Sequence, residues 1–160
     1  PFVEILGCAH SSEGESLIKM SVANGSSVSM LKDLFRKASV KPEEVDYING
    51  YGSASRLNDY LETKVYQDFF KERAKQIPIS VGKPQFGHLN TAAAALELVS
   101  TVLMIKNSKI APTLNFGEPD PDCNLDYVPN QARVCKVKIA LKMAFGFGWS
   151  NAGILIKSIH

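Results

Sequence analysis

Apolar residues along this chain follow two spacings, one typical of strands and one typical of helices. Short β-rich runs at residues 2–7, 45–49 and 77–81 predict strands, each followed by polar or glycine-containing segments. Residues 10–25 are mixed and predict a loop with a short apolar turn at Leu17–Ile18. Two helices are predicted between the strands by apolar residues on one face: Met30, Leu31, Leu34, Phe35 and Ala38, then Leu57, Leu61, Val65 and Phe69.

A third predicted helix, residues 89–106, is apolar on nearly every side, so we expect it to be central and buried. Residues 125–128 could form a further strand. Two β-rich segments, 134–144 and 152–156, flank a glycine-rich turn and predict a hairpin. Strands and helices therefore alternate before a run of strands, which indicates an α/β fold with a mixed sheet.

Composition narrows the class of protein. The chain has 160 residues, enough for one domain, and a formal net charge of +2 with mixed signs, which gives no footprint for nucleic acid. No apolar run reaches the roughly 20 residues that a membrane helix needs. The three cysteines form no metal-ligand pattern, and we expect reduced thiols in a cytoplasmic protein without a metal site.

Three loops carry candidate chemistry, and each follows a predicted strand, where α/β sheets bind ligands. In residues 49–55, two serines could bind a ligand or cap the next helix. In residues 83–88, a histidine lies at a helix start, where the positive end of the helix dipole favours its neutral form. A neutral imidazole could donate a hydrogen bond to a developing oxyanion, or the histidine could be a capping residue. In residues 145–151, aromatic side chains could line a pocket or pack into the core. Taken singly, none of these loops decides between the two readings.

The three loops belong to an ordered series of short motifs along the chain. The segments are Asn49-Gly-Tyr-Gly-Ser-Ala-Ser55, Asn58-Asp59, Glu62-Thr63, Lys83-Pro-Gln-Phe-Gly-His-Leu89, Ala92–Ala95, Pro112-Thr-Leu-Asn115, Asp120-Pro121, Leu125-Asp-Tyr-Val-Pro-Asn130 and Phe145-Gly-Phe-Gly-Trp-Ser-Asn151. In this order, the segments resemble the C-terminal half of β-ketoacyl-ACP synthases of the thiolase fold. The resemblance covers essentially all of residues 1–160 and implies a mixed five-stranded sheet flanked by helices. The family's nucleophilic cysteine lies in its N-terminal half, so we expect the chain, which begins at Pro1, to be part of a longer protein.

The resemblance also implies roles for individual residues, and we expect them to meet at one site. His88 and Lys83 match the family's second active-site histidine and motif lysine, whereas the first histidine is replaced by Tyr51. The glutamate of the following helix is Glu97. The implied substrate-binding positions are Ser53 and Ser55 for the phosphopantetheine arm, the gating Phe147, and Trp149, which replaces a glycine.

Condensation in this family needs two imidazoles that stabilise a thioester enolate, and Tyr51 replaces one of them. A phenol can donate a hydrogen bond, but it is longer than imidazole and has an ordinary pKa of about 10. Loss of one oxyanion donor costs on the order of 10² to 10³ in rate. Three interpretations stay open: a non-condensing subunit resembling a chain-length factor, an altered but active or decarboxylating ketosynthase, and a non-enzymatic carrier-protein-binding module.

The resemblance further implies which cofactors and partners to expect for this chain. We expect no cofactor in the chain itself, because the phosphopantetheine arm arrives on an acyl carrier protein as part of the substrate. The expected partners are the N-terminal ketosynthase half, a second ketosynthase-like subunit and the acyl carrier protein.

Overall fold

The computed structural model describes residues 1–14 and 25–159, so the apolar turn predicted at Leu17–Ile18 lies outside the described residues. Its main feature is a mixed five-stranded sheet with the order β1-β7-β6-β2-β3, flanked by helices. The predicted α/β class and sheet are thereby confirmed. The strands are β1 (Val3–Ser12), β2 (Tyr47–Asn49), β3 (Ile79–Ser80), β6 (Ile139–Gly146) and β7 (Ser150–Ser158), with β4 (Lys109–Ile110) and β5 (Arg133–Val134) paired separately; the α-helices are α1 (Gly25–Ala38), α2 (Arg56–Phe70), α3 (Lys83–Phe86) and α4 (Ala93–Asn107).

The directions of the strands explain where the loops go. β2 pairs in parallel with both β3 and β6, so the carboxyl ends of all three point to the same edge. β6 and β7 form the predicted antiparallel hairpin. β1 continues to Ser12, beyond the predicted end at residue 7, because β7 pairs with it along its whole length.

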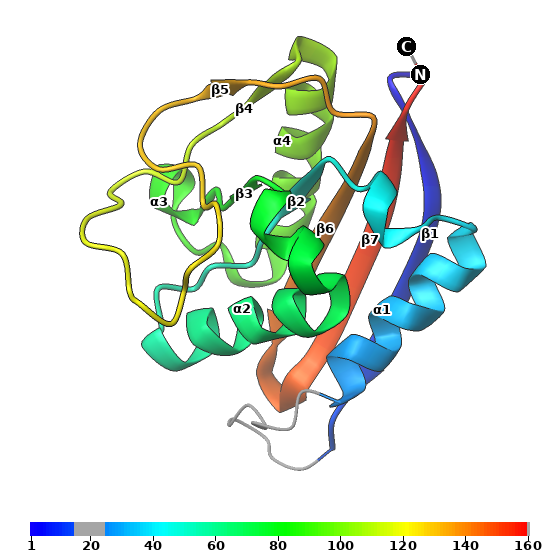
Figure 1. The fold of residues 1–160 in the computed structure, drawn as a ribbon, viewed down its shortest axis with the longest axis horizontal. Helices are drawn as coiled ribbons and strands as arrows, with labels where there is room; N and C mark the ends of the chain where they lie inside the picture. Colours follow the sequence, from blue (N-terminus) through cyan, green and yellow to red (C-terminus); the bar gives the residue numbers. More distant parts are fainter. Residues whose placement is uncertain (15–24, 160) are drawn as a thin grey trace.

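Helices cover both faces of the sheet. α1 and α2 lie together on one face and α4 lies on the other (Figure 1). Because successive side chains of a strand point to opposite faces, Ile48 of β2 packs under α1 and α2, while its neighbour Tyr47 packs under α4. The sheet is therefore the middle of three layers.

The prediction that the third helix is buried on all sides is wrong for this chain. Glu97 and Thr101 of α4 face the sheet and are buried, but Leu96, Val99 and Leu103 are 39%, 54% and 52% exposed. The physical reason is that a helix apolar all round needs a cover on two sides, and this chain supplies a sheet on one side only.

Two loop segments also differ from the prediction. Residues 125–128 form no strand; the carbonyl oxygen of Asp126 accepts from the N–H of Ile79, and a single bridge pairs the following residue, Pro129, with Thr113. Residues 83–86, predicted as loop, form the short helix α3. Among the described residues, no helix combines the length and apolarity required to span a bilayer.

Candidate functional site

Two loops bring the predicted catalytic residues together at the carboxyl edge of the parallel strands. The hydroxyl of Tyr51, in the loop after β2, lies 3.1 Å from Nε2 of His88, in the loop after β3. Lys83, at the start of α3, donates from Nζ to the carbonyl oxygen of Tyr51, and the same ammonium lies 4.1 Å from the centre of the Tyr51 ring. Tyr51, Lys83 and His88 thus form one contiguous group.

Phe147 makes no ring contact with this group among the described residues, and its place beside the group stays a prediction. β6 pairs with β2 up to Lys142, opposite Asn49, and then continues alone with β7. Phe147 lies beyond the end of β6, in the short turn that leads to β7, and its side chain is 86% exposed. The aromatic ring that contacts Tyr51 is instead Phe145, edge-on with its centre at 5.8 Å.

Ser53 and Ser55 lie in different surroundings in the structure. Ser53 lines a cavity, its backbone N–H donates to Asp59, and its hydroxyl accepts a hydrogen bond from the side-chain amide of Asn58. Ser55 is the N-cap residue of α2 but makes no side-chain capping bond, and it is exposed outside that cavity. The side chain of Trp149 lies outside the described residues.

A buried charge cluster lies beneath Tyr51. The carboxylate of Glu97, on α4, is 2.7 Å from Nζ of Lys83 and 2.8 Å from Nζ of Lys142, on β6. All three side chains are at most 6% exposed. Burial lowers the pKa of Lys142, and the nearby Glu97 carboxylate opposes that shift. Asn49 joins the cluster to α4 by donating to Thr101 and to the backbone oxygen of Glu97.

Charged side chains also hold the main chain of the Tyr51 loop. The carboxylate of Glu62, on α2, accepts from the N–H groups of Tyr51 and Gly52 at 2.7 and 2.9 Å. Lys142 lies 3.4 Å from the carbonyl oxygen of Gly50. Gly52 has φ +47°, and a Cβ there would lie 2.5 Å from a valine methyl group, so this turn requires glycine.

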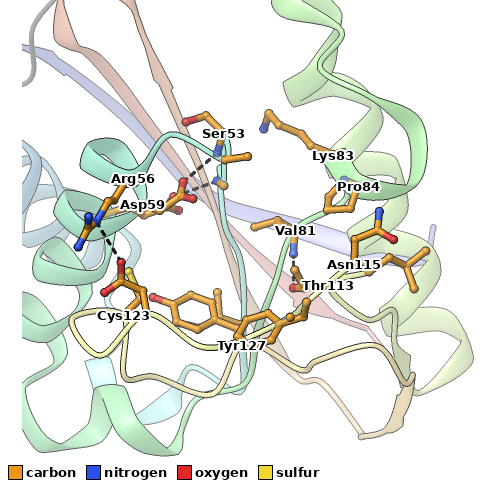
Figure 2. A pocket seen from close by; sticks show the side chains of 18 of the residues that line it. Ser53, Arg56, Asp59, Val81, Lys83, Pro84, Thr113, Asn115, Cys123 and Tyr127 are labelled. Carbon is orange, nitrogen blue, oxygen red and sulfur yellow. Dashed lines mark hydrogen bonds and ion pairs between the residues drawn. The ribbon is translucent and has the colours of Figure 1, made fainter.

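A cavity of about 680 Å³ opens beside the loop, between α2, α3 and residues 113–127. Figure 2 shows Ser53 and Asp59 on one wall, with Lys83 facing them and Tyr127 along the opposite side. Burial, followed by the charge of Glu62, raises the pKa of Asp59 to about 6. The cavity wall therefore holds a carboxyl group that changes charge near neutral pH.

The sequence reasoning missed part of this site. Glu62 stood in a matching segment, but the sequence alone did not indicate that its carboxylate holds the neighbouring loop. Lys142 was missed altogether; its signal was a lysine in the otherwise apolar run 139–145. A buried lysine needs an acid, and the acid that meets it comes from α4, 45 residues earlier in the sequence.

Solved ketosynthase structures share this fold. A type II polyketide synthase ketosynthase, solved with its acyl-carrier protein and bound to the hexaketide, has a TM-score of 0.95 at 31% identity, over 99% of this chain and 39% of that one. The ishigamide ketosynthase/chain length factor gives 0.92 at 28% identity, over 99% of this chain and 38% of that one.

Sequence relatives point to the same family. The 3-oxoacyl-acyl-carrier-protein synthase 2 of Coxiella burnetii is 33% identical over 158 residues, 99% of this chain and 38% of that protein. The oxytetracycline polyketide putative beta-ketoacyl synthase 1 of Streptomyces rimosus is 43% identical over 119 residues, 74% of this chain and 28% of that protein. The chain thus spans well under half the length of these relatives. Residues 2–117 match the family described as "Beta-ketoacyl synthase, C-terminal domain", and the chain belongs to that family.

Proposed function

We propose that this chain is the C-terminal part of a ketosynthase-like subunit in fatty acid or polyketide biosynthesis, one that does not condense at its own pocket. In this proposal it resembles a chain-length factor and shapes the acyl tunnel of a catalytic partner subunit. The observation that carries the proposal is Tyr51, which takes the place of the first imidazole and whose hydroxyl is engaged with His88 at 3.1 Å. Two independent imidazole donors for an enolate oxygen are then absent from the described site.

The assembly follows from the same reasoning. The exposed apolar side chains of α4, Leu96, Val99 and Leu103, form a face suited to packing against the N-terminal ketosynthase half. We further propose a second ketosynthase-like subunit and an acyl carrier protein as partners, with the phosphopantetheine arm entering as substrate. The solved ketosynthase/chain length factor supports such a pairing, because its domain matches this chain along 99% of its length.

A second candidate function is an altered, decarboxylating ketosynthase. It is favoured by the fit of Tyr51, whose ring packs edge-on against His88 and lies under the Lys83 ammonium. A phenol held in this way can offer one hydrogen bond to a thioester enolate as CO2 leaves. Decarboxylation without condensation is the outcome that separates this function from the first.

The test uses the full-length protein with its partner subunit, assayed for malonyl-ACP decarboxylation and for condensation. We expect neither reaction at this pocket in the unmutated assembly when the partner's nucleophile is removed. Tyr51→His should bring decarboxylation into the measurable range, because a second imidazole donor returns. The proposal is wrong if, with the partner's nucleophile removed, the unmutated pocket still condenses and Tyr51→Phe abolishes that activity.

A further inference from the structure

The position of one hydrogen atom on His88 follows from its neighbours. The backbone N–H of Asn90 donates to Nδ1 of the imidazole at 3.0 Å. A backbone amide can only donate, so Nδ1 must be the nitrogen that carries a lone pair. A neutral imidazole has a single N–H, and in His88 it is therefore on Nε2.

The direction of the His88–Tyr51 hydrogen bond follows in turn. Nε2 of His88 lies 3.1 Å from the hydroxyl oxygen of Tyr51, and Nε2 is the protonated nitrogen. The imidazole therefore donates and the phenol oxygen accepts. The phenol hydrogen is then left to point away from His88.

The phenol keeps that hydrogen at neutral pH. Burial raises the pKa of Tyr51 above its ordinary value, and the carboxylates of Glu62, Glu97 and Asp59 raise it further. The ring is also fixed in direction, because it packs edge-on against His88 and Phe145, with both ring centres at 5.8 Å.

We infer that Tyr51, and not His88, presents the hydrogen-bond donor of this pair to the ligand, and that His88 is a positioning residue whose one N–H is spent on the Tyr51 oxygen. The ligand atom that suits this arrangement is an acceptor without a hydrogen, such as the carbonyl oxygen of an acyl thioester, a choice that rests on the proposed function. The site then offers the ligand one hydrogen-bond donor, the Tyr51 phenol held by His88, in place of two imidazoles that donate independently.

Asn90 fixes the relay through its backbone. Its φ is +50°, in the left-handed region, which asparagine tolerates better than most residues with a side chain. This conformation turns its N–H back toward the His88 ring, two residues earlier. Asn90→Gly should preserve the relay, whereas Asn90→Val, which resists a positive φ, should disturb it.

Neutron diffraction of the deuterated full-length protein tests the hydrogen positions directly. We expect deuterium on Nε2 of His88, none on Nδ1, and the O–D bond of Tyr51 directed away from Nε2. Deuterium on Nδ1, or an O–D bond aimed at Nε2, would overturn the inference. Neither observation depends on catalysis, so this result and the condensation assay can fail independently.

Imidazole nitrogen NMR on histidine-labelled full-length protein gives the matched test of roles, with the His88 signal assigned by its loss in His88→Gln. The Nε2–H tautomer should persist in Tyr51→Phe and in Asn90→Gly, since the Asn90 amide sets it, and Asn90→Val should lose it. The Nδ1–H tautomer in the unmutated protein would show that the phenol donates to His88 and would sink the assignment. Tyr60→Phe, on α2 away from His88, is the control and should leave the signal unchanged.

Discussion

Neutralising Glu97 should destabilise the protein far more than neutralising a surface acid. In Glu97→Gln the side chain keeps its size, but Lys83 and Lys142 lose the carboxylate that lies 2.7 and 2.8 Å from their ammonium groups. Removing one partner of a buried ion pair costs about 3–5 kcal/mol, because an uncompensated charge stays in the interior. Since two ammonium groups are affected, we expect the upper part of that range.

Lys142→Met should be milder than Glu97→Gln. Burial lowers the pKa of Lys142 in spite of Glu97, so desolvation of its ammonium already opposes folding. Methionine removes that penalty, leaves Glu97 paired with Lys83, and forfeits the contact with the carbonyl oxygen of Gly50. We expect a loss of about 1.5–3 kcal/mol, the net value of hydrogen bonds to a charged group. The double variant should lose less than the sum of the two single losses.

Equilibrium urea unfolding of the full-length protein measures these differences as shifts in the midpoint at an unchanged slope. The matched control is Glu72→Gln, because Glu72 pairs with Lys75 at 3.2 Å with side chains 89% and 62% exposed. Exposed pairs of this kind contribute about 0.5 kcal/mol or less. If Glu97→Gln also stays within about 0.5 kcal/mol of the unmutated protein, the buried lysines are not charged and the reasoning fails.

Three further perturbations test other parts of the structure. Asp59, with its pKa raised to about 6, contributes stability below its ordinary pKa and loses that contribution as pH rises through 6, so Asp59→Asn should flatten this fall in unfolding measurements from pH 4 to 8. Gly52→Ala should cost roughly 2 kcal/mol or more in the same assay, because φ is +47° and a Cβ would clash, whereas Gly117→Ala should be neutral in open space. Replacing Val99 and Leu103, which are 54% and 52% exposed, by serine should weaken co-purification with a separately expressed N-terminal half, and unchanged co-purification would remove α4 from that interface.

The fold could be predicted from the sequence wherever a helix or strand packs against this chain's own core. The periodic residues of α1, such as Met30 and Leu34, are buried, and the alternation of Tyr47 and Ile48 between two cores follows from strand geometry. The exposure of Val99 could not be predicted from the sequence. The apolar pattern of α4 indicates that its sides should be buried, but it does not show whether this chain or another one buries them. The full length of β1 was also missed, since its polar end is held by pairing with β7 rather than by apolar side chains.

Only part of the site could be predicted from the sequence, for a related reason. Local motifs located Tyr51, Lys83 and His88, because loops after parallel strands meet at one edge. They did not indicate that Phe147 is exposed, because the motif does not show whether this chain covers the turn after β6. They missed Lys142 as well, because its role depends on Glu97 from a distant helix and not on its own neighbours.

Both the backbone and the side chain of Tyr51 are fixed by hydrogen bonds, so this residue does more than leave a histidine position empty. Its backbone is bound on both sides, by Glu62 at the N–H and by Lys83 at the carbonyl, and its hydroxyl receives the N–H of His88. A histidine at this position would keep the backbone contacts but would be too short to accept from His88 without movement of the loop. The charge cluster therefore holds the position of the loop, and in the proposed function the loop presents a phenol coupled to His88 in place of an independent imidazole.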